Sequence, residues 1–234
     1  MSKSKIISLI ILALIILAIG SYFLFFNQKL TNKEVRTEDL LAFNNQDEKL
    51  SQATLDKYFQ EFTWAKDNIL KNTATFETNS WLTIARLKKY MKDYAGAEQV
   101  YLYVLKRDTV NYIPEANLAD LYGNYLNNWD KAVEHYWLAV NKTGQNKGAA
   151  FIFYQNLTDI YSAQLKDKRL DFEKKVLEAL EKDYGGSVDF LTMLAKYYKD
   201  IGDKNKAISY LEKALAMNPP NAPIIRDEIA ELKK

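Results

Sequence analysis

Residues 190–220 read FLTMLAKYYKDIGDKNKAISYLEKALAMNPP, and this stretch decides how the rest of the chain is interpreted. Leu191, Leu194 and Tyr198 recur at the spacing that places them on one face of a helix. Gly202 interrupts this pattern, a second apolar stripe follows, and a pair of prolines ends it. The stretch therefore predicts two short amphipathic helices joined by a tight turn.

The small and large residues of these two helices alternate with the spacing of a known repeat. Ala195, Ala207 and Ala214 stand where two helix backbones must approach closely, and leucines and tyrosines stand between them. This spacing resembles the tetratricopeptide repeat, with Leu191 in place of the family's tryptophan and Leu211 in place of its phenylalanine. Because one such hairpin cannot bury its own apolar face, the resemblance implies neighbouring hairpins that share a core.

Three further units with similar spacing precede this stretch. Two columns of the second helix make the period visible, and their members are separated by 35, 40 and 35 residues. The first column consists of Ala97, Ala132, Phe172 and Ala207. The second column consists of Tyr101, Tyr136, Val176 and Leu211. Four units of about 34 residues predict an array of repeats over residues 78–220.

The units depart from the family pattern in different ways. Lys88 stands in the first unit where the family has a tyrosine. The second unit carries one extra residue in its turn, and the third carries two extra residues around Lys166 to Arg169. We expect loops to absorb the extra residues, because loops tolerate insertions.

Helical segments are predicted on both sides of the array. Residues 51–77 form an N-terminal helical segment that covers one end of the stack. Residues 221–234 form a capping helix with Ile225 and Ile229 on its apolar face, as repeat arrays need at their ends. The predicted fold is all-α: a right-handed α-solenoid of about four tetratricopeptide-like helix hairpins, with an N-terminal transmembrane helix and a C-terminal capping helix.

The transmembrane helix is predicted for residues 6–26, which read IISLIILALIILAIGSYFLFF and carry no charge. At about 1.5 Å per residue this run spans about 30 Å, the thickness of a bilayer core. Residues 1–5 form a short tail, and the polar residues 27–50 form a flexible linker. A cleaved signal peptide is the alternative, because Ala18-Ile19-Gly20 is a small-x-small triplet. The apolar run is longer than that of a usual signal peptide, so we favour the anchor.

The charges on the two sides of this segment define its orientation weakly. Lys3 and Lys5 lie before it, whereas Lys29, Lys33 and Arg36 follow it. A long C-terminal domain can be translocated largely regardless of its charge. We therefore expect a single-pass protein of the bacterial inner, or cytoplasmic, membrane, with the C-terminal body outside the cytoplasm.

The composition argues against most site chemistries. The chain has no cysteine and one histidine, His135, so it lacks the residues of a thiolate nucleophile, a catalytic triad or a Cys/His zinc site. The net charge is +2, and two of the bases precede the apolar run, so the body is neutral and unlike a nucleic-acid binder. The carboxylates are interspersed with lysines in the manner of helix-surface pairs. We predict no catalytic residue, no cofactor, no metal site and no enzymatic activity.

The remaining candidate for a site is a groove for a protein or peptide partner. In the family that this chain resembles, the first helix of each repeat lines a concave face where peptides or partner helices bind. By that resemblance the groove residues are basic at both ends and acidic or amide-rich in the middle. They are Leu82, Arg86, Lys89, Tyr90, Asn117, Asp120, Asn124, Gln155, Asp159, Thr192, Lys196 and Lys199.

The sequence thus predicts a membrane-anchored scaffold or adaptor that mediates protein–protein interactions at the cell envelope. One alternative is a structural component of a secretion, pilus or division apparatus, in which self-assembly replaces a peptide ligand. Another is an envelope enzyme that uses two convergent carboxylates.

Overall fold

A computed structural model describes residues 36–72, 74–179, 184 and 186–234. The chain divides into two units, Met1–Ala42 and Phe43–Lys234, and the described part of the first unit holds the short helix α2 (Thr37–Leu40). The segment predicted to cross the membrane, residues 6–26, lies outside the described residues. Within the described ranges, no helix is both long enough and apolar enough to span a bilayer.

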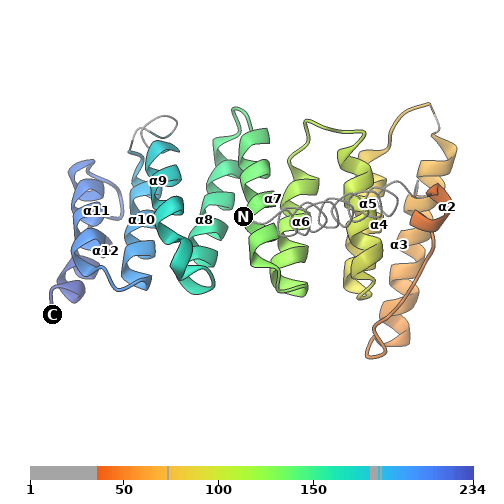
Figure 1. Ribbon diagram of the computed structural model, residues 1–234, viewed down its shortest axis with the longest axis horizontal. Helices are drawn as coiled ribbons and strands as arrows, with labels where there is room; N and C mark the ends of the chain where they lie inside the picture. The colour runs from red at the N-terminus through yellow and green to blue at the C-terminus, as the bar shows by residue number, and fades with distance from the viewer. Residues whose placement is uncertain (1–35, 73, 180–183, 185) are drawn as a thin grey trace, which may run out of the picture. The chain divides into compact units, whose positions relative to one another are not determined.

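The larger unit is a row of helices that pack side by side in chain order (Figure 1). It begins with α3 (Gln52–Lys71) and ends with α12 (Ala222–Leu232). The four hairpins between them are α4 (Thr78–Tyr90) with α5 (Tyr94–Leu105), α6 (Ile113–Asp120) with α7 (Trp129–Lys142), α8 (Lys147–Ala163) with α9 (Arg169–Ala179), and α10 (Val188–Asp200) with α11 (Lys204–Ala216). The described part of the chain contains eleven α-helices and no strand, which confirms the all-α, solenoid-like prediction.

The columns predicted from the period form the core of this row. Ala97, Ala132, Phe172 and Ala207 are each fully buried. Small residues at three of these positions let a second helix approach the first helices closely, and the large ring of Phe172 fills the corresponding space in the third hairpin. The core is therefore shared between hairpins rather than divided among them.

The first and fourth hairpins turn in the same way. Lys92 and Gly202 each adopt a positive φ, +60° and +85°, at the end of the first helix. The next residue, Asp93 or Asp203, caps the second helix by accepting a hydrogen bond of 3.1 Å from the backbone N–H three residues on. Such a cap satisfies a backbone donor that would otherwise lack a partner.

The second hairpin holds its extra residue inside the helix and not, as predicted, in the turn. Leu121–Tyr125 form a π-helix, η1, that continues α6, and the Leu126 N–H bonds the Leu121 carbonyl at 3.1 Å. One turn with five-residue spacing absorbs the insertion. The turn that follows keeps the usual form, with Asn127 at φ +51° and Asn128 as the N-cap of α7.

The third hairpin holds its extra residues in a short 3₁₀-helix, η2 (Lys166–Lys168), between α8 and α9. This placement agrees with the predicted position of the insertion around Lys166 to Arg169. At the end of the row, α12 buries Ile225 and Ile229 and packs on α11, as a capping helix does.

The last part of the segment predicted as a linker, 27–50, contacts the first hairpin. The Gln46 N–H donates to the Met91 carbonyl at 2.8 Å. Phe43 packs edge-on against Phe62 of α3, with ring centres 5.2 Å apart. The apolar ring of Phe43 packs on α3 and Gln46 binds the turn of the first hairpin, so these contacts hold this part of the segment against both elements.

Candidate functional site

The predicted groove residues all lie on the first helices of the four hairpins. Four are on α4: Leu82, Arg86, Lys89 and Tyr90. Three are on α6 and η1: Asn117, Asp120 and Asn124. Five are on α8 and α10: Gln155, Asp159, Thr192, Lys196 and Lys199.

In the N-terminal half of the row, the basic groove residues bind acidic residues of the neighbouring helix. Arg86 of α4 pairs with Glu61 of α3, and Lys89 of α4 pairs with Asp120 of α6. The Lys89 ammonium also lies 5.1 Å from the ring centre of Tyr125. These cations are therefore neutralised within the protein.

In the C-terminal half, two lysines of α10 make the corresponding links. Lys196 lies 2.8 Å from Asp159 of α8 and 2.8 Å from Asp200 of its own helix. Lys199 lies 2.8 Å from Glu228 of α12. The hydrogen bonds that Lys196 donates to Asp159 and, second in size, to Asp200 raise the pKa of Lys196, so this lysine stays charged while the pairs persist.

One pair of consecutive first helices lacks such a link. Among the described residues, no ion pair joins α6 or η1 to α8. A cavity of about 240 Å³ opens there instead, lined by residues of α6, η1, α7 and α8. We call it the η1–α8 pocket. Its lining residues are Ala119, Gly123, Asn124, Trp129, Tyr136, Asn156, Asp159, Ile160, Ala163 and Gln164.

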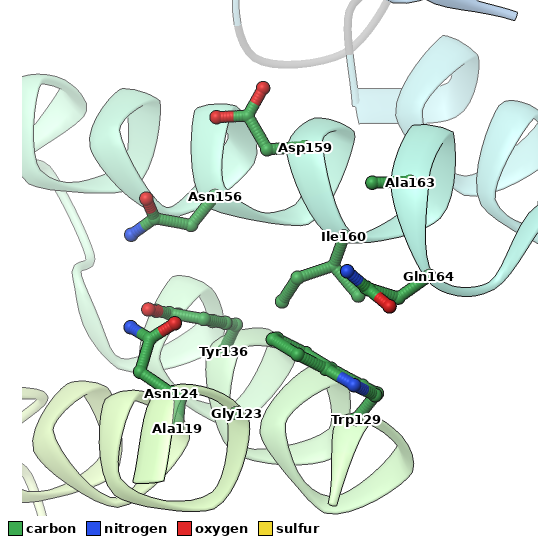
Figure 2. Close-up of a pocket in the computed structure, with 10 residues that line it drawn as sticks. All are labelled: Ala119, Gly123, Asn124, Trp129, Tyr136, Asn156, Asp159, Ile160, Ala163 and Gln164. Carbon is green, nitrogen blue, oxygen red and sulfur yellow. The ribbon is translucent and has the colours of Figure 1, made fainter. Parts of the chain in front are cut away.

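The η1–α8 pocket has a polar end and an apolar end (Figure 2). Asn124, Asn156 and the hydroxyl of Tyr136 lie together at one end. At the other, mainly apolar end the Trp129 ring faces Ile160, and the Gln164 carboxamide lies beside them. Burial raises the pKa of Tyr136 to about 12, so its hydroxyl remains protonated near neutral pH and can donate a hydrogen bond.

A glycine in the π-helix allows this arrangement. A Cβ atom at Gly123 would lie 3.0 Å from the Trp129 ring and 3.3 Å from the Cβ of Ala132. Because the glycine has no side chain, the indole packs directly against the η1 backbone. Trp129 thus forms one wall of the pocket without filling it.

A second cavity of about 490 Å³ lies between α8 and α10. Its wall includes Phe151 and Met193 as apolar residues and Lys196 as a cation. Asn156 and Asp159 line both cavities. The two pockets are therefore neighbours on either side of this part of α8.

Five of the predicted groove residues line these pockets: Asn124, Gln155, Asp159, Thr192 and Lys196. In the described part of the chain, neither pocket is lined by Leu82, Arg86, Lys89, Tyr90, Asn117, Asp120 or Lys199. The lining residues that the sequence did not predict for the site include Trp129, Tyr136, Asn156, Ile160 and Gln164. The extra residue between Leu121 and Asn128 was the signal that could have located the first pocket.

A comparison with protein-family models gives one match, over α10, α11 and the turn that follows them. Residues 188–221 match the tetratricopeptide repeat. This match supports the tetratricopeptide family for the chain and coincides with the fourth hairpin. No curated protein matches the sequence.

The histidine lies in an ionic cluster within the second tetratricopeptide-like hairpin. Glu115 is buried, and its two carboxylate oxygens lie 2.7 Å from His135 Nδ1 and 2.7 Å from Lys142 Nζ. The Tyr122 ring stacks on His135, with centres 5.2 Å apart. These contacts join α6, η1 and α7, so His135 has a packing role. The described residues contain no group of three or more potential metal ligands.

Proposed function

We propose that this chain is a scaffold that binds an extended segment of a partner protein across the two pockets of α8. The main support for the proposal is a difference between the steps from one first helix to the next, because some steps have an ion pair and one has a pocket instead. Ion pairs link α3, α4 and α6, and they link α8, α10 and α12. Among the described residues none links α6 or η1 to α8, and carboxamide side chains of α8 line the cavities on both sides of that helix. Tetratricopeptide repeats generally bind protein partners, and the match at residues 188–221 supports this class of function.

Carboxamides suit a peptide backbone as ligand. Each carries N–H donors and a carbonyl acceptor, which can bind the C=O and the N–H of a peptide group, respectively. Asn156 and Gln155 lie on α8 and make no side-chain hydrogen bond to any described residue. An extended segment that reached them would satisfy these groups without breaking an existing interaction, so we propose binding and no catalysis.

Site-specific photo-crosslinking tests the proposal. A benzophenone amino acid is placed at Gln155, which is exposed and lines the second pocket, in the full-length chain in its native host. The matched control is the same amino acid at Gln99, an exposed glutamine on the second helix of the first hairpin. We expect a defined partner band from position 155 and none from 99. The same bands from both positions, or none from 155, would contradict the proposal.

We further propose that residues 6–26 anchor this scaffold in the bacterial inner membrane, with the body outside the cytoplasm. The support is the uncharged run of 21 residues, which is long enough for a bilayer core. Alkaline carbonate extraction should leave the chain with the membrane, and protease added to spheroplasts should degrade the body. A mature chain that begins at Ser21, or a fully protected body, would refute the anchor or its orientation, respectively.

A further inference from the structure

The residues that line the η1–α8 pocket determine which kind of side chain of a bound segment it can hold. It lies at the one described step between consecutive first helices that has no ion pair across it. A π-turn forms one of its sides, and such turns are frequent at functional sites.

We infer that the partner segment places one large apolar side chain, of the leucine, methionine or phenylalanine type, in the η1–α8 pocket. The carboxamides of Asn124 and Asn156 bind the peptide groups beside that anchor. This inference rests on the proposed function, because it names the class of residue that the same face recognises.

The apolar end of the pocket fits such a side chain in kind and in size. The Trp129 ring and Ile160 face each other there, with the Gln164 carboxamide beside them, and Ala163 adds only a methyl group to the lining (Figure 2). Sites for complete small molecules usually have volumes of about 300–1,000 Å³. A cavity of about 240 Å³ is smaller than these and suits a single side chain.

The electrostatics of the pocket disfavour a charged anchor. Asp159 is the one charged residue among the described residues that line it, and its carboxylate points away from the cavity (Figure 2). That carboxylate is already bound to Lys196 at 2.8 Å. A charged side chain would lose its hydration in the pocket without gaining a counter-ion, which is costly.

The polar end of the pocket fits a peptide group. Asn124 Nδ2 donates to Asp120 Oδ1 at 2.7 Å, which leaves the Asn124 carbonyl oxygen as an acceptor. Within the described residues, the Asn156 side chain makes no hydrogen bond, and it lies beside Asn124 at the same end (Figure 2). Together they offer an acceptor and a donor to the N–H and C=O groups of a bound segment.

An oriented peptide library tests the inference on the full-length chain. The probe is a set of extended octapeptides in which one central position carries each amino acid in turn, and binding is measured by fluorescence polarisation. We expect large apolar residues at that position to bind at least about tenfold more tightly than alanine or charged residues, since burial of one such side chain gives a gain of this order.

The variant Ala163→Phe fills the pocket and should abolish that preference. The matched control is Ala216→Phe, because Ala216 is likewise an exposed alanine at the last position of its helix, α11. Circular dichroism verifies that both variants fold. The double variant Asn124→Ala/Asn156→Ala should weaken every peptide by a similar factor while it retains the apolar preference.

The possible failures are distinguishable. If peptides bind with a preference for charged residues, or if Ala163→Phe binds like wild type, the pocket inference is wrong and the proposed scaffold function stands. If no peptide binds the wild-type chain, and position 155 yields no crosslink, both the inference and the proposed function are wrong.

Discussion

The first hairpin (α4–α5) and the fourth (α10–α11) reach the same geometry with different residues at the same buried position. Lys88 of the first corresponds to Tyr198 of the fourth, and each side chain is about 2% exposed. In both hairpins the residue five positions later caps the second helix. One hairpin thus buries a cation where the other buries an aromatic ring.

The first hairpin accommodates its lysine with a buried partner. Lys88 Nζ lies 3.0 Å from Asp93 Oδ2, and that carboxylate is also the N-cap of α5. In the fourth hairpin Tyr198 stacks on Tyr210 at 5.4 Å, and Asp203 serves as cap in a half-exposed position. Besides its role as cap, the aspartate of the first hairpin binds a buried cation, whereas that of the fourth contacts the half-exposed Lys206 at 3.8 Å.

The family match falls on the fourth hairpin, whose residues lie nearer to the family pattern than those of the first. The fourth retains the tyrosine of the family pattern as Tyr198 and has Gly202 in its turn. The first replaces them with Lys88 and Lys92, yet it has the same turn. This position requires a buried side chain that packs well and whose charge, if it has one, is paired. Lys88 with Asp93 meets this requirement, and so does the ring of Tyr198.

The largest effect on stability is expected when the cap of the first hairpin, Asp93, is compared with that of the fourth, Asp203. Asp93→Ala removes a cap and leaves the Lys88 ammonium buried without this partner, so we expect a loss of about 3–5 kcal/mol in the free energy of unfolding. Asp203→Ala removes a cap and a long, exposed contact to Lys206, which contributes little, and should cost about 1 kcal/mol. Urea unfolding followed by circular dichroism measures both. Equal losses would show that the Lys88–Asp93 pair has no special role.

A double variant sharpens this result. Lys88→Met/Asp93→Ala replaces the buried cation with an apolar residue of similar length, so no charge remains to be compensated. It should recover most of the loss caused by Asp93→Ala and differ from wild type mainly by the cost of one cap. If the double variant is as unstable as Asp93→Ala, the loss comes from the cap and not from the buried charge.

The turn residues give a smaller effect. Gly202→Ala places a Cβ at φ +85°, where an L-residue is strained by about 1–2 kcal/mol. Lys92→Ala should change stability by less than about 1 kcal/mol, because that position already carries a side chain at φ +60° and loses only an exposed contact to Asp47. Thermal unfolding of both variants tests the contrast, which a comparable loss in each would disprove.

The smallest effect concerns the exposed link at the end of the row. Lys199 pairs with Glu228 of α12 while both side chains remain partly exposed, 46% and 32%. Lys199→Ala should therefore cost less than about 1 kcal/mol, and 1 M salt should reduce that cost further. A loss as large as that of Asp93→Ala would mean that the exposed pairs, and not the shared core, hold the row together.

The order of the helices could be predicted from the sequence, because the residues that become buried recur at a regular spacing along the chain. The columns that include Ala97 and Ala207 recur in the sequence and are fully buried in the structure. The position of an insertion is less visible. A residue added between Leu121 and Asn128 could lengthen the turn or widen the helix into a π-helix, and the hydrogen bond from the Leu126 N–H to the Leu121 carbonyl shows that it widens the helix.

The sequence identified the helices that carry the site, but it did not identify most of the residues that line the pocket. The first-helix pattern led to Asn124 and Asp159, which line the η1–α8 pocket. Trp129 belongs to a second helix, and it reaches the pocket only because Gly123 of the π-turn leaves room for the indole. Lys89 is a basic residue on a first helix, as expected of a groove residue. Its pairing with Asp120 of α6 depends on how the helices pack, which a single sequence does not give.

Hydrogen exchange followed by mass spectrometry tests most directly whether the first hairpin is the same packed unit as the fourth. We expect backbone amides in the middle of α4 and α5 to be protected to an extent similar to those of α10 and α11. Exchange of α4 and α5 at the rate of an unfolded chain, with α10 and α11 still protected, would contradict it.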